Sequence, residues 1–376
     1  METEQIWWEQ TSNPEHFIND IARTLLEEKS IVLPDCNSIP WFSDFINKIK
    51  RRFSESSHEK MCIEINGEIS DIGEYLLDNY CNDQGNKFRP RPNFGHVNFI
   101  AQIKETETTF HNTFFLVLLD NNSLNEWIEF ISKYNQLRNK ESKAVFLLLL
   151  ETEDYDAKKI SNRKGIEIYS FKDSINEYDR MVFAMLASYS LKCSSLLKTY
   201  LTELACNVAG DNIELCSECL QKHEDFLKDP VNVIKNIIEN ETDSNGNRFV
   251  FSKTDDEIEQ AVWTAQIRTF YPLLEEYRRD FIKKYYNEIK EHLPTTTVFN
   301  ETIDTPEEVE LGSLYYLKSD NYYHKSNKWL KIRKEDSYEL KIFRNARHDL
   351  SHLHKLEFQT IQELLGTSFV KNRSKI

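Results

Sequence analysis

The sequence predicts an α/β domain with a doubly wound, mostly parallel sheet, followed by all-α helical domains. Two observations predict this class. Five short apolar segments alternate with segments of helical periodicity in the first half of the chain, a pattern typical of parallel strands joined by crossover helices. Beyond Tyr178 the strand-like segments end, and helical patterns fill the rest of the chain. The predicted domains are residues 1–185, 186–293 and 294–376.

Strand-like and helical segments alternate throughout the first predicted domain. Residues 14–29 carry apolar side chains at helical spacing, and the apolar run 30–33 that follows is closed by Pro34. Residues 114–119 and 145–150 are apolar at every position, as expected for strands buried on both faces of a parallel sheet. The five predicted strands lie within residues 30–35, 61–67, 113–121, 144–152 and 165–171.

Helical patterns predominate in the second half of the chain. Residues 179–210 and 211–229 form two of them. A longer pattern covers residues 256–294, and Pro272 is expected to kink or interrupt it. A connector rich in Thr, Asn and Glu, residues 294–310, leads to the last predicted helices.

Charge and cysteine content narrow the function classes. Lys+Arg of 47 against Asp+Glu of 62 gives a net charge of −15, so the surface as a whole is not suited to duplex DNA, whose phosphates bind Lys and Arg. Seven scattered cysteines, an odd number, favour a reducing cytoplasm over a disulfide framework. No apolar run approaches the ~20 residues that span a bilayer. We therefore expect a cytoplasmic protein that does not cross a membrane.

A phosphate-binding loop is absent from the sequence. Such a loop needs glycines, whose backbone N–H groups wrap the phosphates, together with a Lys and a Ser or Thr. The first predicted strand leads into DCNSIPWFSDF, residues 35–45, which contains no Gly and no Lys, and GxxxxGK[ST] occurs nowhere in the chain. We therefore expect no cofactor and no ATP hydrolysis.

Asp120 stands at the carboxyl end of the third predicted strand, FFLVLLDN. An acidic residue there is a feature of Walker-B strands, although it can equally cap the helix that follows. The order of elements and this aspartate resemble the ATPase domain of STAND-type (AAA-like) signalling ATPases with its phosphate-binding loop lost. The resemblance implies a degenerate P-loop-like domain that keeps the architecture and loses hydrolysis.

Cys216, Cys219 and His223 lie at positions i, i+3 and i+7 of one predicted helix. Three such ligands on one helix face could begin a zinc site, but a structural zinc needs a fourth ligand. The sequence has one CxxC pair here, and buried free cysteines are common on amphipathic helices. We therefore expect these side chains to pack in the core and to bind no metal.

The segment FRNARHDLSHLHKL, residues 343–356, carries the candidate catalytic residues. Residues four apart on a helix are neighbours, so Arg344, His348 and His352 form one polar stripe. The predicted apolar face lies opposite and consists of Phe343, Ala346, Leu350 and Leu353.

Arg347 and His352 have the spacing R-x4-H. This pattern resembles the R-x4–6-H motif of HEPN domains, small helical domains found in many prokaryotic ribonucleases of defence and toxin–antitoxin systems. The resemblance covers at most the last quarter of the chain, and His348 stands where asparagine is commonest. It implies a metal-independent RNA endonuclease in which His352 is the acid/base, Arg347 clamps the phosphate and His348 is a polar helper. It also implies a homodimer formed through the C-terminal domain.

The region around Arg347 and His352 can also be interpreted from its local charge and from possible structural roles of these two residues. From Lys318 to Lys355, ten Lys/Arg stand against five Asp/Glu with aromatic residues between them, which is typical of a surface for single-stranded RNA and also of a solvated helix face. Arg347 could instead have a structural role. Glu310 lies just before a predicted helix and could form an ion pair with the Arg347 guanidinium. His352 could likewise cap a helix or bond a backbone carbonyl.

The leading functional hypothesis is a non-hydrolysing sensor or regulatory component of a bacterial signalling or antiviral-defence assembly, with a protein partner bound by the degenerate α/β domain. Trp7, Trp8 and Trp41 are candidate anchors for that partner, because interface hot spots are enriched in Trp. They could equally belong to the core. The alternative hypothesis is the RNA endonuclease that uses Arg347 and His352.

Overall fold

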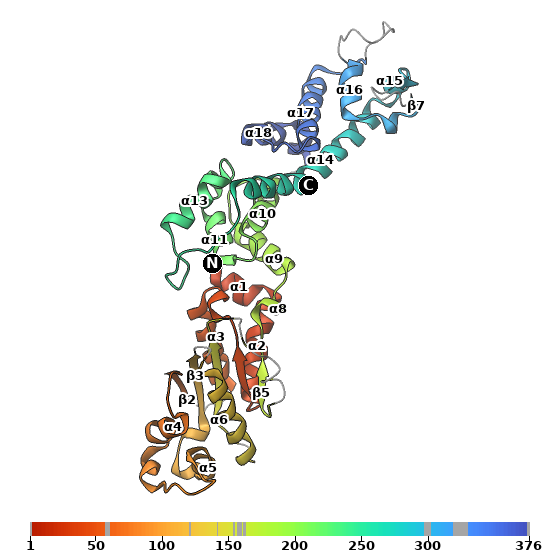
Figure 1. The fold of residues 1–376 in the computed structure, drawn as a ribbon. Helices are drawn as coiled ribbons and strands as arrows, with labels where there is room; N and C mark the ends of the chain where they lie inside the picture. The colour runs from red at the N-terminus through yellow and green to blue at the C-terminus, as the bar shows by residue number, and fades with distance from the viewer. Residues whose placement is uncertain are drawn as a thin grey trace. The chain divides into compact units, whose positions relative to one another are not determined.

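The computed structural model describes residues 2–56, 61–119, 122–140, 142–152, 155, 160, 163–296, 302–318 and 330–373. The chain divides into two compact units (Figure 1). The first unit contains Met1–Phe183 and Asp243–Asn247, and the second contains Ala184–Thr242 and Arg248–Ile376.

A five-stranded parallel sheet forms the centre of the first unit. All five strands lie within the segments that the sequence predicts, in the order β2-β3-β4-β1-β5, and every neighbouring pair is parallel. Every residue of β4 is buried, as is every residue of β3 except Leu118. The strands are β1 (Ser30–Leu33), β2 (Met61–Asn66), β3 (Thr113–Leu119), β4 (Val145–Leu150) and β5 (Ile166–Ile168).

Helices cover both faces of this sheet, so the predicted α/β class is confirmed. On one face, Phe53 of α3 packs against Phe114 of β3 with ring centroids 4.9 Å apart, and α2 packs beside α3. Phe115, the next residue of β3, points to the opposite face and packs there with residues of α4, α5 and α6. These helices are α2 (Ser12–Leu26), α3 (Phe42–Ser56), α4 (Ile72–Tyr80), α5 (His96–Gln102) and α6 (Leu124–Leu137).

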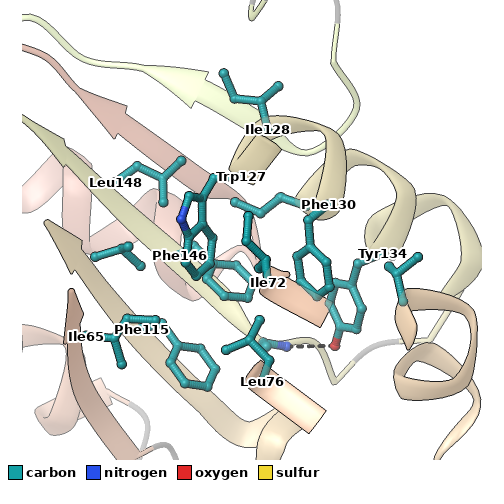
Figure 2. Packing of buried hydrophobic residues seen from close by; sticks show 14 of the residues in the cluster. Ile65, Ile72, Leu76, Phe115, Trp127, Ile128, Phe130, Tyr134, Phe146 and Leu148 are labelled. Carbon is teal, nitrogen blue, oxygen red and sulfur yellow. Dashed lines mark hydrogen bonds between the residues drawn. The ribbon is translucent and has the colours of Figure 1, made fainter. Parts of the chain in front are cut away.

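Figure 2 shows the apolar core on this second face of the sheet. Phe115 and Phe146, from neighbouring strands, stack with centroids 5.1 Å apart, and Trp127 of α6 packs against Phe146 at 5.8 Å. The Trp127 indole N–H donates to the carbonyl of Gly67 at 2.9 Å. A Cβ at Gly67 would lie 2.0 Å from a methyl of Leu119, so the close approach of β2 and β3 at this point requires glycine.

The tryptophans near the N-terminus belong mainly to the core of the first unit. Trp7 and Trp8 of α1 (Thr3–Gln10) are fully buried, and both rings pack against Phe171. Trp41 is half-buried, with its ring 5.9 Å from that of Phe183. Of the two alternatives left open for Trp7 and Trp8, the core position is confirmed, because α1 places them among other aromatic rings.

Helices form most of the second unit, and α14 (Asp255–Lys284) is the longest of them. A reciprocal capping box between Thr254 and Glu257 fixes its first turn. The helix continues through Pro272, so this proline does not interrupt it. The same helix packs against α10 (Ser195–Ala209) and α17 (Lys334–Ser351). These contacts join the predicted middle and C-terminal regions in one unit.

The predicted boundary at residue 294 therefore falls inside the second unit. Helix α9 (Glu177–Ser188) runs across the division between the units. Within the described residues, no helix is both long and apolar enough to cross a membrane. The other helices used below are α8 (Phe171–Ser174), α11 (Ile213–Gln221), α12 (His223–Phe226), α16 (Leu311–Lys318) and α18 (Phe358–Gly366).

Candidate functional site

The loop after β1 occupies the position at which a P-loop would follow its strand. Three of its backbone N–H groups are bonded inside the protein. Asp35 N–H donates to the carbonyl of Thr152 at 3.2 Å. Ser38 N–H donates to the carbonyl of Asp35 at 3.0 Å, and Ile39 N–H donates to that of Cys36 at 3.2 Å. Groups bonded in this way are not directed at a phosphate.

Apolar side chains fill the same loop. Cys36 and Ile39 are buried, with exposed fractions of 2% and 1%. Burial, to which the negative charges of Glu151 and Asp35 add, raises the pKa of the Cys36 thiol to about 12. Cys36 is therefore a neutral packing group, and a phosphate at this position would face two carboxylates.

A cavity of about 290 Å³ lies beside this loop, where β1 and β5 end. Ligands of open α/β sheets bind at the carboxyl ends of the strands. Asp35 and Asp173 supply two carboxylates against the single ammonium of Lys172, so the lining does not attract a polyanion. Asp120, predicted at the same edge, lies outside the described residues. The cavity is lined by Pro34, Asp35, Ser38, Tyr155, Ser170, Phe171, Lys172 and Asp173.

Arg347, on α17, is held by carboxylates from two other segments. Its Nε donates to Glu275 of α14 at 3.2 Å, and its Nη2 forms an ion pair with Glu310. Arg278 binds the other oxygen of Glu275 at 2.7 Å. The predicted pairing with Glu310 is thus confirmed. The Nε and Nη2 groups of the guanidinium are both occupied by protein carboxylates. This is the arrangement of a structural arginine.

His348 and His352 lie side by side on the exposed part of the same segment. Their ring centroids are 4.4 Å apart. Helix α17 ends at Ser351, and the N–H of His352 bonds the carbonyls of His348 and Asp349, each at 3.1 Å. Arg347 and His352 are separated by about 140° around a helix axis. The structure therefore brings the two histidines together and places Arg347 in a separate carboxylate network.

The rest of the predicted polar and apolar faces is partly confirmed. The Arg344 guanidinium lies 5.5 Å from the centre of the Tyr315 ring on α16. Phe343 is buried and stacks on Tyr277 with centroids 3.8 Å apart. The prediction for Leu353 is wrong, because the helix ends before it, its φ is +62° and its side chain is 73% exposed.

Side chains of α14 hold the segment that follows α17. The Trp263 indole N–H donates to the carbonyl of Leu350 at 3.1 Å. The Gln266 amide bonds both backbone groups of Leu356, donating to its carbonyl at 2.9 Å and accepting from its N–H at 2.6 Å. These contacts fix the course of the chain between α17 and α18.

Cys216 and Cys219 of α11 are buried, and His223 begins the next helix, α12. Burial raises the pKa of the Cys219 thiol, so this side chain remains a neutral packing group. Across the described parts of the chain, no cluster of three or more His, Cys, Asp or Glu side chains is placed to hold a metal ion. Cys216 and Cys219 are therefore residues of the core, as expected.

Helix α9 carries exposed apolar side chains that the sequence pattern alone does not reveal. Ala184 is buried, and the large apolar side chains that follow it in the second unit are exposed at helical spacing. The spacing is visible in the sequence, but it does not tell which side of the helix the core covers. In the second unit, the exposed fractions are 59% for Met185, 37% for Leu186 and 80% for Tyr189, just beyond the helix.

No protein-family model and no curated protein matches this chain. Similar solved structures include the Aeropyrum pernix ORC2 protein in ADPNP–ADP complexes, at 11% identity and a TM-score of 0.29, with 96% of this chain and 94% of that chain covered. Drosophila ORC bound to DNA is similar at 13% identity and a TM-score of 0.32, with 97% and 86% covered. TM-scores this low are evidence neither of a shared fold nor of a shared activity.

Proposed function

We propose that this protein is a non-hydrolysing regulatory component of a multiprotein assembly, and that its α/β unit serves as a binding domain without nucleotide turnover. The loop after β1 carries this proposal. The N–H groups of Asp35, Ser38 and Ile39 are bonded within the protein, and the neighbouring carboxylates oppose a polyanion. A nucleotide would therefore lose hydration at this edge of the sheet without gaining a phosphate cradle.

The setting that we propose is a bacterial signalling or antiviral-defence assembly. The support is the resemblance of the element order to STAND-type (AAA-like) signalling ATPases, together with the parallel sheet that the chain forms. A domain that keeps such a sheet without the phosphate-binding loop retains a rigid framework and its outer surfaces.

The exposed face of α9 supports a protein partner. Met185 and Tyr189, both in the second unit, are each more than half exposed, and they lie four residues apart. Contiguous exposed apolar patches on proteins in water mark interaction sites, and Tyr and Met are enriched in interfaces. We propose this face as a contact surface for a protein of the assembly.

A charge placed on this face tests the proposal. Because Met185 is 59% exposed, Met185→Glu costs the fold little and places a carboxylate in the interface. We expect the partner recovered with the tagged chain from its host to bind the purified variant at least tenfold more weakly than the wild type. Val250→Glu, at a side chain that is 89% exposed, is the matched control and should bind normally. Equal binding of the wild type and Met185→Glu contradicts the α9 surface.

A metal-independent RNA endonuclease is the second proposal, and the adjacent exposed rings of His348 and His352 favour it, because paired histidines can act as acid and base. The carboxylate partners of Arg347 argue for a structural role of that residue. We expect Arg347→Ala to lower the free energy of unfolding by about 1 kcal/mol, as for a partly exposed ion pair. We expect His352→Ala to leave it unchanged.

Growth of cells that produce each variant separates the two proposals. In the regulatory account, neither Arg347→Ala nor His352→Ala changes RNA integrity or growth. Wild-type toxicity that both substitutions relieve, in variants that are still folded at the growth temperature, would establish the endonuclease instead.

A further inference from the structure

A groove of about 570 Å³ lies between the first turns of α14 and the segment that links α17 to α18. Trp263 and Leu353 are the large apolar side chains of its lining. The polar atom of Trp263, the indole N–H, is already bonded to the carbonyl of Leu350. Trp263 therefore offers the groove an apolar ring surface with no unsatisfied donor.

Leu353 is held in an exposed position by its neighbours in the chain. The bonds of Trp263 to Leu350 and of Gln266 to Leu356 fix the backbone on both sides of it. Its φ of +62° is unusual for a residue with a branched side chain. With the backbone held in this way, the Leu353 side chain is 73% exposed to water. A ligand in the groove would cover it.

The rim of the groove is acidic. Its lining includes the carboxylates of Asp256, Glu259 and Glu357, and one ammonium, that of Lys355, which bonds Glu259 at 2.7 Å. Three carboxylates against one ammonium leave the groove with a negative charge that its own lysine does not balance. Such a rim attracts cationic side chains and opposes nucleic acid.

We propose that this groove binds a peptide segment of a partner protein in which an apolar side chain is flanked by arginines. The apolar side chain packs on Trp263 and Leu353. Guanidinium groups pair with Asp256 and Glu357, and a planar guanidinium also stacks well on an indole ring. The volume is in the range of pockets that hold small ligands and peptide side chains. This site is distinct from the α9 face and does not depend on the function proposed above.

The test is a selection from a displayed library of random twelve-residue peptides against the immobilised full-length chain. We expect the enriched peptides to combine Arg with large apolar residues. Fluorescein-labelled copies of the enriched peptides are then titrated with the purified chain in solution. Replacing their arginines with glutamate should weaken binding at least tenfold, and so should replacing their apolar residues with serine.

Two substitutions in the groove test its role while preserving the fold. Leu353→Gly removes the apolar wall, and glycine adopts a positive φ without strain, so the chain should be no less stable than the wild type. Glu357→Lys reverses one charge at a position whose side chain makes no capping bond. Each should weaken binding at least tenfold. Val250→Gly and Glu363→Lys, at other exposed positions of the same unit, are matched controls and should bind within twofold of the wild type.

Three outcomes would overturn the proposal. One is a selection that enriches no peptide whose binding is lost in the Leu353→Gly chain. Another is enrichment of acidic peptides. The third is displacement of the labelled peptide by a single-stranded RNA oligonucleotide as effectively as by unlabelled peptide. A failure of Met185→Glu to affect partner binding would leave the groove standing, so the two surfaces are tested separately.

Discussion

His111 shows at the residue scale how a buried polar side chain is satisfied in the first unit. Its Nε2 lies 3.1 Å from the carbonyl of Ile103, which can only accept, so Nε2 carries the proton. Its Nδ1 therefore accepts from the Tyr134 hydroxyl at 2.8 Å, and that hydroxyl accepts from the N–H of Ala144 at 3.1 Å. Burial, with the charge of Arg138, lowers the pKa of His111 to about 3.

The pKa of His111 predicts a pH dependence of stability. The unfolded chain binds a proton at this side chain near pH 6.5, whereas the folded chain does so only near pH 3. As the pH falls through this window, the unfolded state gains a proton that the folded state lacks, and the free energy of unfolding drops by about 1.4 kcal/mol per pH unit from this group.

His111→Phe should remove that part of the slope. At pH 7.5 the variant should be less stable by about 1–3 kcal/mol, because the Tyr134 hydroxyl and the Ile103 carbonyl lose their partner. Urea unfolding followed by tryptophan fluorescence at several pH values between 4 and 7.5 measures both effects. Parallel slopes for the two proteins would show that His111 does not titrate as described.

The sequence predicts the partner of a side chain when that partner is close in the chain and has the opposite charge. The ion pair between Arg347 and Glu310 was foreseen because a carboxylate precedes the neighbouring helix. Trp7 and Trp8 were not resolved, since an aromatic residue fits a core and an interface equally well. The Glu275 partner of Arg347 was missed because it lies on a helix 72 residues earlier in the chain.

At the scale of elements, the strands were the most predictable feature and the helix ends the least. Continuous apolar runs located β3 and β4, because only a doubly covered strand buries every side chain. The end of α17 was missed because no Gly or Pro marks it. Beyond this point, the side chains of Trp263 and Gln266 donate hydrogen bonds to the backbone carbonyls of Leu350 and Leu356. The same limit explains why Leu353 was assigned to the apolar face.

Gly67 gives a prediction about the pairing of β2 and β3. A Cβ at this position would lie 2.0 Å from the Leu119 side chain and 2.9 Å from the Leu118 carbonyl oxygen. Gly67→Ala must therefore shift the strands apart or displace Leu119, and we expect a loss of about 1–3 kcal/mol of stability, the usual cost of overpacking.

Thermal unfolding measures the loss at Gly67, and hydrogen exchange of β2 and β3 shows whether it is local. Gly95→Ala is the matched control, because a Cβ there meets no atom within 4 Å. A Gly67→Ala chain as stable as the Gly95→Ala chain would mean that the strands are not packed as closely as described.

At the scale of the whole molecule, the sequence predicted the α/β class and the helical remainder. It did not predict that the middle and C-terminal helices form one unit. Helical periodicity identifies the apolar face of α14, but it does not say that α10 and α17 both pack on this helix. The face of α9 is a similar case, since its exposure depends on which elements lie opposite. The proposed function rests mainly on a feature of the sequence itself, the missing phosphate-binding loop.

Nucleotide titration of the full-length chain tests the central claim most directly. The chain is titrated with a fluorescent ATP analogue and Mg²⁺, and unlabelled ATP is then added as a competitor. We predict no saturable binding up to about 1 mM nucleotide, a limit that corresponds to a binding free energy of about −4 kcal/mol. Saturable binding well below that concentration, displaced by ATP and weakened by Lys172→Ala, would contradict the account of a sheet edge that binds no phosphate.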